Sequence, residues 1–376
     1  MSGLVTFDDA PPADTINFGV GQPSADLMPL ALVAEASESF FSSAESIELN
    51  YGVKLGDPRF LETLAGFLQA GYHSTVDSEE LFVTGGNSQA LDLVSSLFAR
   101  PGDTVFVEEP SYFLAFKIFR DHDLNIVSIP MDKDGLLIDE LEQALPLHKP
   151  AFLYTIPSFQ NPSGLSTSEN RRQQILQLAE KYEFLVVADE VYQFLYYGEE
   201  PPAAYGTMIE SGRVLSLGSF SKILAPGMRL GWIQSSAALR NRLSTSGFVN
   251  SGGSINHISS LIVRQAIENG GLNEHIKKLR LSYGNRVQAM DDALHTHFGG
   301  IARWTRPEGG YFFWLEFDQS VKTKTLRKKA GEFKTGFQPG PLFTPNEGLD
   351  NYLRLSFAHY QEKEIHEGIG RLRKLF

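Results

Sequence analysis

Short apolar runs alternate with amphipathic stretches through the middle of the chain. The runs at residues 81–84, 104–108 and 151–156 have the length and composition of strands, whereas residues 87–98 repeat apolar positions at helical spacing. Residues 184–188 are apolar throughout, which is typical of a parallel strand that is covered on both faces. This alternation of strands and helices predicts an α/β domain built around a mainly parallel sheet.

The pattern changes in the last third of the chain. Before that point, further strands are predicted at residues 125–129, 214–217 and 230–234, and helices at residues 28–41, 60–70 and 237–248. After it, we expect helices at residues 257–298 (with a break at 269–271), 321–334 and 361–375, and strands at residues 302–305, 311–316 and 351–357. Because this part is α+β, we predict a large domain at residues 45–270 and a small domain made of residues 1–44 and 271–376.

Composition narrows the classes of function. A chain of 376 residues suits two domains, and a net charge of -12 argues against a nucleic-acid partner. No apolar run is long enough to span a membrane, and residues 1–14 show no secretory signal. The chain has no cysteine, and its scattered histidines predict no metal site. These features favour a cytoplasmic protein.

The candidate chemistry centres on Lys222, which lies in the stretch SLGSFSKILAPGMRLGW at residues 216–232. Ser219, Ser221 and Arg229 are its neighbours in sequence, and hydroxyl and guanidinium groups suit a phosphate. A lysine that lies beside other cations has a lowered pKa and becomes a nucleophile towards aldehydes. Phosphate, aldehyde and lysine are together the requirements of pyridoxal phosphate. Taken alone, S-x-S-K is also compatible with an ordinary solvated turn.

The extension A-P-G-x-R-x-G-W makes this stretch resemble the Schiff-base segment of the class I and II aminotransferases, which are fold type I pyridoxal-phosphate enzymes. The resemblance covers most of the chain and is nearest in pattern to the aminoadipate, kynurenine and aromatic aminotransferase branch. It implies an α/β large domain, a smaller α+β domain, and pyridoxal 5'-phosphate bound through Lys222.

Three other loops resemble the cofactor site of this family. Asp189 follows the apolar run at residues 184–188, where the resemblance implies an anion against the pyridine nitrogen. A structural ion pair is the alternative for this carboxylate. Asn161 in the N-P-S-G loop and Tyr192 resemble the two residues that bond the cofactor phenolate oxygen. Tyr112 resembles the aromatic residue that stacks on the pyridine ring.

The resemblance also implies a phosphate site that two subunits share. Its candidate residues within one chain are Asn87, Ser88, Ser219, Ser221 and Arg229. The start of a helix suits an anion, because its backbone N–H groups are free. Tyr51 resembles the tyrosine that reaches the phosphate of the other subunit, although a tyrosine packed at a turn is the simpler alternative. If the resemblance holds at Tyr51, the active species is a homodimer with shared sites.

The substrate carboxylate has a candidate partner in Arg354. This residue stands among apolar strand residues in N-Y-L-R-L-S-F, an expensive place for an unpaired guanidinium. A structural salt bridge would resolve that cost, whereas the resemblance implies a bidentate clamp on the α-carboxylate of the substrate. Gly21, in the segment at residues 16–23, and Asn161 are implied to lie near the same carboxylate.

Together these inferences predict an aminotransferase that moves an amino group from an L-amino acid to a 2-oxo acid. The resemblance implies that Lys222 carries the cofactor and moves the α-proton of the substrate, with Asp189 and Tyr192 as further catalytic groups. A lyase or synthase of the same fold remains an alternative because it uses the same cofactor motifs.

A ligand-sensing domain of an aminotransferase-like transcription factor is less favoured. The resemblance begins near Ile16, which leaves no room for a DNA-binding module ahead of it, and the charge is acidic. The identity of the substrate stays open. Phe159, Tyr311 and Phe312 are candidates for an apolar or aromatic pocket.

Overall fold

The computed structural model describes residues 14–376 and is organised around an eight-stranded sheet of strand order β2-β9-β8-β7-β6-β3-β4-β5. These strands are β2 (Leu81–Thr84), β3 (Thr104–Glu109), β4 (Asn125–Asp132), β5 (Gly135–Leu136), β6 (Phe152–Thr155), β7 (Leu185–Asp189), β8 (Val214–Ser219) and β9 (Gly231–Ser235). The neighbours from β4 through β3, β6 and β7 to β8 pair in parallel, while β2, β9 and β5 pair antiparallel. Residues 1–13, where we expect no secretory signal, lie outside the described part.

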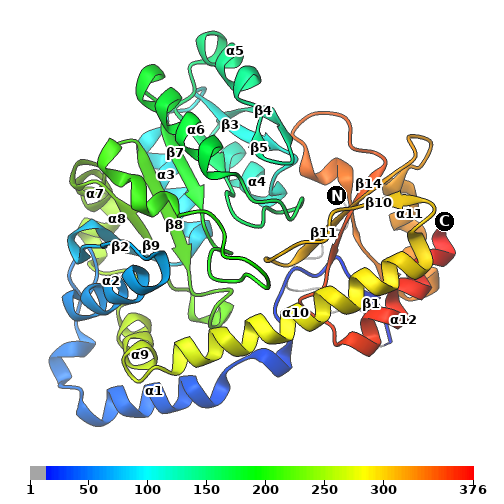
Figure 1. Cartoon of the computed structure of the whole chain (residues 1–376). Coiled ribbons are helices and arrows are strands. Elements are labelled where there is room, and N and C mark those ends of the chain that lie inside the picture. The colour runs from blue at the N-terminus through cyan, green and yellow to red at the C-terminus, as the bar shows by residue number, and fades with distance from the viewer. Residues whose placement is uncertain (1–13) are drawn as a thin grey trace.

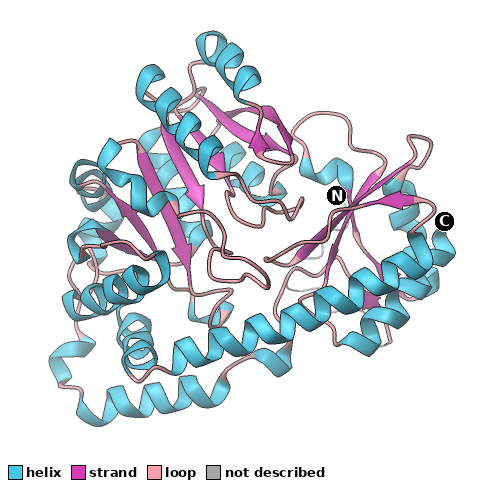
Figure 2. Ribbon diagram, viewed as in Figure 1, coloured by secondary structure: helices cyan, strands magenta, loops and turns pink. Residues whose placement is uncertain are grey.

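Helices cover both faces of this sheet, as Figure 2 shows. On one face, strand residues such as Val105 and Val187 form a core with α2 (Pro58–Tyr72), α3 (Asn87–Phe98) and α4 (Phe113–Asp121). On the other face, their sequence neighbours Phe106 and Val186 form a separate core with α5 (Ile138–His148) and α6 (Glu169–Tyr182). This alternation confirms that the continuous apolar runs are strands covered on both sides.

A second, antiparallel sheet has the strand order β10-β11-β14-β13. Its strands are β10 (Ala302–Arg303), β11 (Phe312–Phe317), β13 (Gln338–Pro339) and β14 (Tyr352–Ser356). Nearby, β1 (Ile16–Asn17) pairs in parallel with β12 (Thr335–Gly336). The helices of this part are α11 (Thr323–Lys329) and α12 (Glu362–Leu372), and α12 packs against α10 (Gly271–Phe298).

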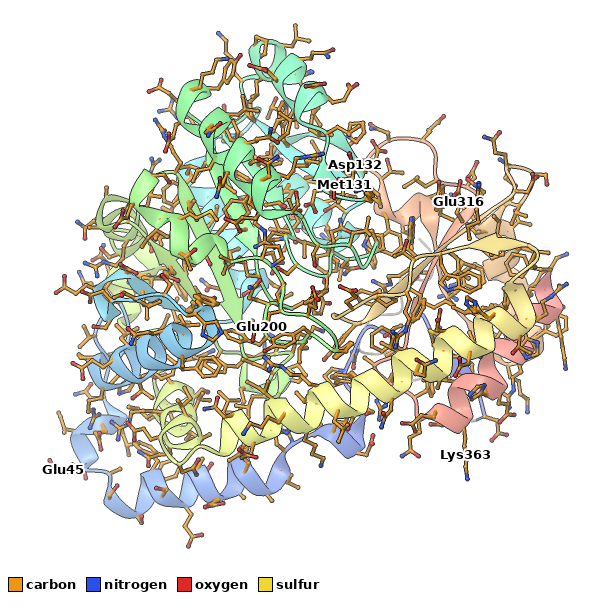
Figure 3. The ribbon with its side chains drawn as sticks, viewed as in Figure 1. Glu45, Met131, Asp132, Glu200, Glu316 and Lys363 are labelled. Atoms are coloured by element: carbon orange, nitrogen blue, oxygen red, sulfur yellow. The ribbon has the colours of Figure 1, made fainter. Side chains whose placement is uncertain are left out.

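Helix α10 extends from α9 (His257–Glu268), on the side of the large sheet, to α12, on the side of the small sheet (Figure 1). It follows α9 directly, and α1 (Leu30–Ser43) packs along α9. The N-terminal segment therefore contacts both parts of the molecule, with β1 on the small-sheet side and α1 on the large-sheet side. In Figure 3, Glu45 after α1 and Lys363 on α12 mark opposite ends of the molecule.

Some predicted helices are divided or shortened in the structure, and residues 361–375 form α12 followed by a 3-10 helix at Arg373–Leu375. Residues 237–248 form α7 (Ala237–Ser244) and α8 (Gly247–Gly252), because the Ser246 hydroxyl accepts from the Val249 N–H and starts a new helix. Residues 321–334 form the shorter α11 followed by a 3-10 turn. Within residues 14–376, no helix has the length and apolar character needed to cross a membrane.

Candidate active site

The carboxyl ends of four neighbouring parallel strands meet at one edge of the large sheet. Tyr112 follows β3, Asn161 follows β6, Asp189 ends β7 and Lys222 follows β8, and all four line one pocket. Arg354 on β14 lines the same pocket from the small sheet. Open α/β sheets bind their ligands at this position, so the topology brings together residues that are far apart in sequence.

Lys222 lies in an environment that favours its neutral form. Its Nζ donates to the Gly21 carbonyl oxygen at 3.0 Å and lies 5.0 Å from the centre of the Tyr311 ring. Burial, and then the nearby Arg354 cation, lower the pKa of Lys222 to about 8, while Asp189 opposes the shift. A neutral amine is the nucleophilic form, so this lysine suits attack on an aldehyde.

Asp189 is buried at the end of β7. Its Oδ1 accepts from Asn87 Nδ2 at 2.5 Å, and its Oδ2 accepts from the Tyr154 hydroxyl at 2.9 Å. Burial raises the pKa of Asp189, whereas these two hydrogen bonds and the Lys222 charge favour the ionised form. No cation of the described residues lies within salt-bridge distance of Asp189, so a structural ion pair does not account for it.

A group of polar residues lies where β8, the Pro226–Met228 turn and the start of α3 meet. Ser219 Oγ accepts from the Ser221 N–H at 3.1 Å and donates to the Ser221 Oγ at 3.0 Å. Arg229 Nη2 donates to the Gly85 carbonyl oxygen at 3.0 Å. The start of α3 carries no side-chain cap. This end of the pocket therefore offers a guanidinium, hydroxyls and free helix N–H groups to an anion.

Arg354 is a buried cation with polar but uncharged partners. It is 3% exposed, and it donates to Asn161 Oδ1 at 2.9 Å and to the Gly19 carbonyl oxygen at 3.0 Å. Its guanidinium lies 4.0 Å from the centre of the Phe312 ring, its Nε has no partner, and burial lowers its pKa to about 10. Among the described residues it makes no salt bridge, which leaves it available to an anionic ligand.

Three further predicted residues also line the pocket. Tyr112 is half-buried at the start of α4, and burial raises its pKa to about 12. Tyr192 is buried, and its ring packs edge-on against Phe312 with 6.1 Å between the ring centres. Gly21 approaches the Phe312 ring so closely that a Cβ atom would lie 3.2 Å from it. A side chain at this position would therefore narrow the space beside Arg354.

Asn87 lies at the start of α3, as predicted for a residue of the phosphate site. Its side-chain amide donates to Asp189 and to the Leu217 carbonyl oxygen, so its backbone N–H is the group that it offers to a phosphate. The α3 start brings the side chain over the end of β7, which sequence spacing cannot reveal. Ser88 is exposed and lines the pocket.

Other candidates lie apart from the pocket. Tyr51 is 83% exposed and is not among the pocket-lining residues of its own chain. Phe159 and Tyr311, candidates for an apolar substrate pocket, are buried and do not line it, whereas Phe312 does. Sequence reasoning missed Tyr154, because a tyrosine in an apolar strand is read as a core residue. It also missed Phe113 and Leu114, which line the pocket directly after Tyr112.

The fold and the site together define a class of enzyme. A lysine of lowered pKa fits an aldehyde, the buried Asp189 carboxylate fits a ring nitrogen, and the cluster at the start of α3 fits a phosphate. These are the reactive and charged groups of pyridoxal phosphate. The α/β architecture with this set of residues is that of a fold type I pyridoxal-phosphate enzyme.

Comparisons with known proteins give the family. Residues 13–372 match the family model of class I and II aminotransferases. The aromatic-amino-acid aminotransferase 1 of Thermococcus litoralis is 34% identical over 365 residues, which cover 96% of this chain and 87% of the relative. The uncharacterized HTH-type transcriptional regulator YdfD of Bacillus subtilis is 31% identical over 96% of this chain and 73% of the regulator.

A solved structure agrees with this family. It is the crystal structure of LysN, an α-aminoadipate aminotransferase of Thermus thermophilus, complexed with N-(5'-phosphopyridoxyl)-L-leucine. Its TM-score is 0.88 at 31% identity, and the match covers 96% of this chain and 92% of that one. The chain therefore belongs to the class I and II aminotransferases. It is a pyridoxal-phosphate-dependent enzyme that transfers an amino group from an amino acid to a 2-oxo acid, as the sequence predicts.

Proposed function

We propose that Lys222 binds the aldehyde of the cofactor and moves the proton at the α carbon of an L-amino acid substrate. The observation that carries this proposal is the convergence of Lys222, Asp189 and Arg354 on one pocket. Bound pyridoxal phosphate supplies an aldehyde carbon and a ring that accepts electrons. Lys222 supplies a neutral amine, Asp189 supplies the anion for the ring nitrogen, and Arg354 supplies the cation for the α-carboxylate.

The remaining lining residues would hold the cofactor. Tyr112 supplies an aromatic face for the ring, and Asn161 and Tyr192 supply donors for its phenolate oxygen. We assign the phosphate to the residues at the start of α3 and after β8, which are Asn87 and Ser88 through their backbone N–H groups, together with Ser219, Ser221 and Arg229. Gly21 and Asn161 lie beside Arg354 and would border the substrate carboxylate.

Borohydride reduction of the holoenzyme tests this assignment. Reduction should fix the cofactor covalently to Lys222, and mass spectrometry of the digested protein locates the adduct. The Lys222→Ala variant should lose turnover and still bind the cofactor through its phosphate. An adduct on another lysine, or none, would contradict the assignment.

We infer that the preferred amino donors carry apolar or aromatic side chains. In the described chain, the charged residues that line the pocket are Asp189, Lys222, Arg229 and Arg354, and each already has a role above. Much of the remaining wall is apolar and includes Phe113, Leu114 and Phe312. A second carboxylate would lose its hydration there without gaining a cation.

A donor screen checks this inference. We expect kcat/KM for phenylalanine or leucine to exceed that for aspartate by at least about tenfold, because a carboxylate buried without a cation is penalised. A donor profile led by aspartate would contradict the inference and would indicate a further cation supplied by a second subunit.

We also propose a homodimer in which Tyr51 of one chain contacts the phosphate bound by the other. Large apolar side chains are exposed along the segment that carries it, namely Leu30, Phe41, Ile47, Leu49, Tyr51 and Val53. Exposed apolar groups of this density support an interface.

We further propose that residues 45–270 form one domain and that the two flanking segments form a second, which limited proteolysis can test. We also propose a cytoplasmic location, which cell fractionation can test.

A further inference from the structure

Both carboxylate oxygens of Asp189 accept hydrogen bonds from side chains that come from different elements. Asn87, at the start of α3, donates to Oδ1 at 2.5 Å, and Tyr154, on β6, donates to Oδ2 at 2.9 Å. Two donors on separate elements fix the plane of the carboxylate as well as its position. An unsupported aspartate could rotate about its side-chain bonds.

Among the described residues, the Tyr154 hydroxyl has one hydrogen-bond partner, which is Asp189. Its side chain is fully buried, and its ring packs edge-on against Phe119 with 5.5 Å between ring centres. Burial raises the pKa of Tyr154 well above its usual range, so the phenol remains a proton donor wherever the enzyme works.

We propose that Tyr154, together with Asn87 on the opposite oxygen, is a positioning residue that holds the Asp189 carboxylate ionised and directed at the cofactor ring. This inference rests on the role proposed for Asp189. The physical reason is that a carboxylate in an apolar interior prefers to be neutral unless donors stabilise its charge. Burial raises the pKa of Asp189, and the bonds from Asn87 and Tyr154 are the largest influences that lower it again.

The other titratable groups around Asp189 do not replace these donors. Lys222 favours the ionised form, but its influence on the pKa of Asp189 is smaller than that of either hydrogen bond. Glu108 on β3 has a raised pKa and repels a second negative charge. Tyr112 and Tyr192 are kept neutral by burial, which raises the pKa of both. The two side-chain donors therefore rank first among the groups that favour the ionised form, ahead of the Val191 N–H and Lys222.

The Tyr154→Phe variant tests the proposal on the holoenzyme. Removing a donor to the ionised form raises the pKa of Asp189, so protonation of this residue occurs at a higher pH. The acidic midpoint in the pH dependence of cofactor affinity should therefore rise by about one unit, since a hydrogen bond to a charged group is worth roughly tenfold or more. Below the midpoint the cofactor Kd should rise by up to about tenfold, and kcat should fall while KM for the donor changes little.

Tyr205→Phe is the matched control. Tyr205 is also fully buried, but its hydroxyl donates at 3.5 Å to the Arg172 carbonyl oxygen, away from Asp189. This variant removes the same atom from a buried tyrosine, so it should leave the acidic midpoint and kcat at their wild-type values. A shift shared by both variants would mean that Tyr154 acts through general stability and would overturn the proposal.

Two further measurements separate the possible failures. In an Asp189→Asn background, Tyr154→Phe should have much less effect on kcat, because its partner charge is gone; an equal loss in both backgrounds would overturn the positioning role. If Asp189→Asn itself left kcat unchanged, the proposed function would fail instead.

If the Tyr154→Phe variant does not fold, Asn87→Ala takes its place, because Asn87 donates to the other carboxylate oxygen of Asp189. An unchanged acidic midpoint in Asn87→Ala would overturn the proposal.

Discussion

At the residue scale, burial decides the chemistry of Lys222. With a pKa of about 8, roughly half of this amine is neutral at pH 8, compared with well under about 1% of an ordinary lysine. We expect the rate at which the cofactor-free enzyme captures pyridoxal phosphate to rise with pH through a midpoint near 8 and then level off. Stopped-flow absorbance measures this rate.

The control for this prediction changes Arg354, which lowers the pKa of Lys222. Arg354 is the second cause of the lowered pKa, after burial. In Arg354→Met the midpoint should therefore move to a higher pH. A rate that keeps rising towards pH 10 in the wild type would show that the amine is not tuned by its surroundings.

Arg354 itself illustrates a conflict between stability and function. Its guanidinium is buried without an anionic partner, which is unfavourable in the absence of substrate. We expect Arg354→Met to raise KM for amino donors by about a hundredfold, because a charge-assisted bidentate contact is lost. The free energy of unfolding without substrate, measured in urea, should stay the same or increase. An unchanged KM with a loss of stability would indicate a purely structural residue.

At the scale of secondary-structure elements, local sequence accounts for most of the fold. The helix predicted at residues 87–98 is α3 without change, and the strand predicted at residues 81–84 is β2. Their apolar periodicity and flanking glycines act within a few residues, so sequence alone suffices. The split between α7 and α8 was missed, because the Ser246 hydroxyl forms a cap inside a pattern that otherwise continues.

The site was less predictable where contacts join distant strands. Asp189 and Asn161 were predicted from motifs at strand ends and Arg354 from a motif within β14, and all three line the pocket. The bond from Tyr154 to Asp189 joins neighbouring strands, β6 and β7, whose adjacency no local pattern specifies. The bond from the Asn87 side chain to Asp189 was not predicted for the same reason. Family motifs identify chemical groups, whereas their supporting contacts require the three-dimensional arrangement.

Glu108 connects two secondary-structure elements, because it links the end of β3 to the loop that carries Asn161. Its buried carboxylate accepts from the Thr155 hydroxyl at 2.5 Å, from the Ile156 N–H at 3.1 Å and from Gln160 Nε2 at 3.1 Å. We expect Glu108→Ala to lower the free energy of unfolding by about 2–4 kcal/mol, since it leaves buried donors unpaired.

Two further variants serve as comparisons for the stability of Glu108→Ala. Glu108→Gln keeps an acceptor and should lose less stability than Glu108→Ala. Glu142→Ala, which breaks an exposed ion pair with Lys181, should change stability by less than about 1 kcal/mol. Equal effects of the buried and exposed substitutions in urea unfolding would contradict the role of Glu108 as a connection between β3 and the loop.

At the scale of the whole molecule, residues of both sheets line the pocket. Lys222 and Asp189 belong to the large sheet, and Arg354 and Phe312 belong to the small one. The residues proposed to hold the cofactor and the arginine proposed to bind the substrate carboxylate therefore belong to different parts of the chain, joined by α10 and the N-terminal segment. A change in the relative position of the two sheets would alter substrate affinity more than cofactor affinity.

The shared-site proposal belongs to this scale, and a mixing experiment tests it. Tyr51 is highly exposed and absent from the pocket of its own chain, so a contact with cofactor requires a second copy. Lys222→Ala and Tyr51→Ala should each be impaired as homodimers. In a hybrid dimer, one site carries both lesions, while the other combines an intact Lys222 with an intact Tyr51.

Refolding the two variants together should therefore restore activity above that of either parent, up to about half of the wild-type sites in each hybrid. Native mass spectrometry confirms that hybrids have formed. Mixing Lys222→Ala with Asp189→Asn is the control, because both residues belong to the same pocket of one chain and every hybrid site keeps a lesion. If Tyr51 acted within its own chain, the first mixture would behave like this control. Recovery in the first mixture alone requires that each active site is built from two chains.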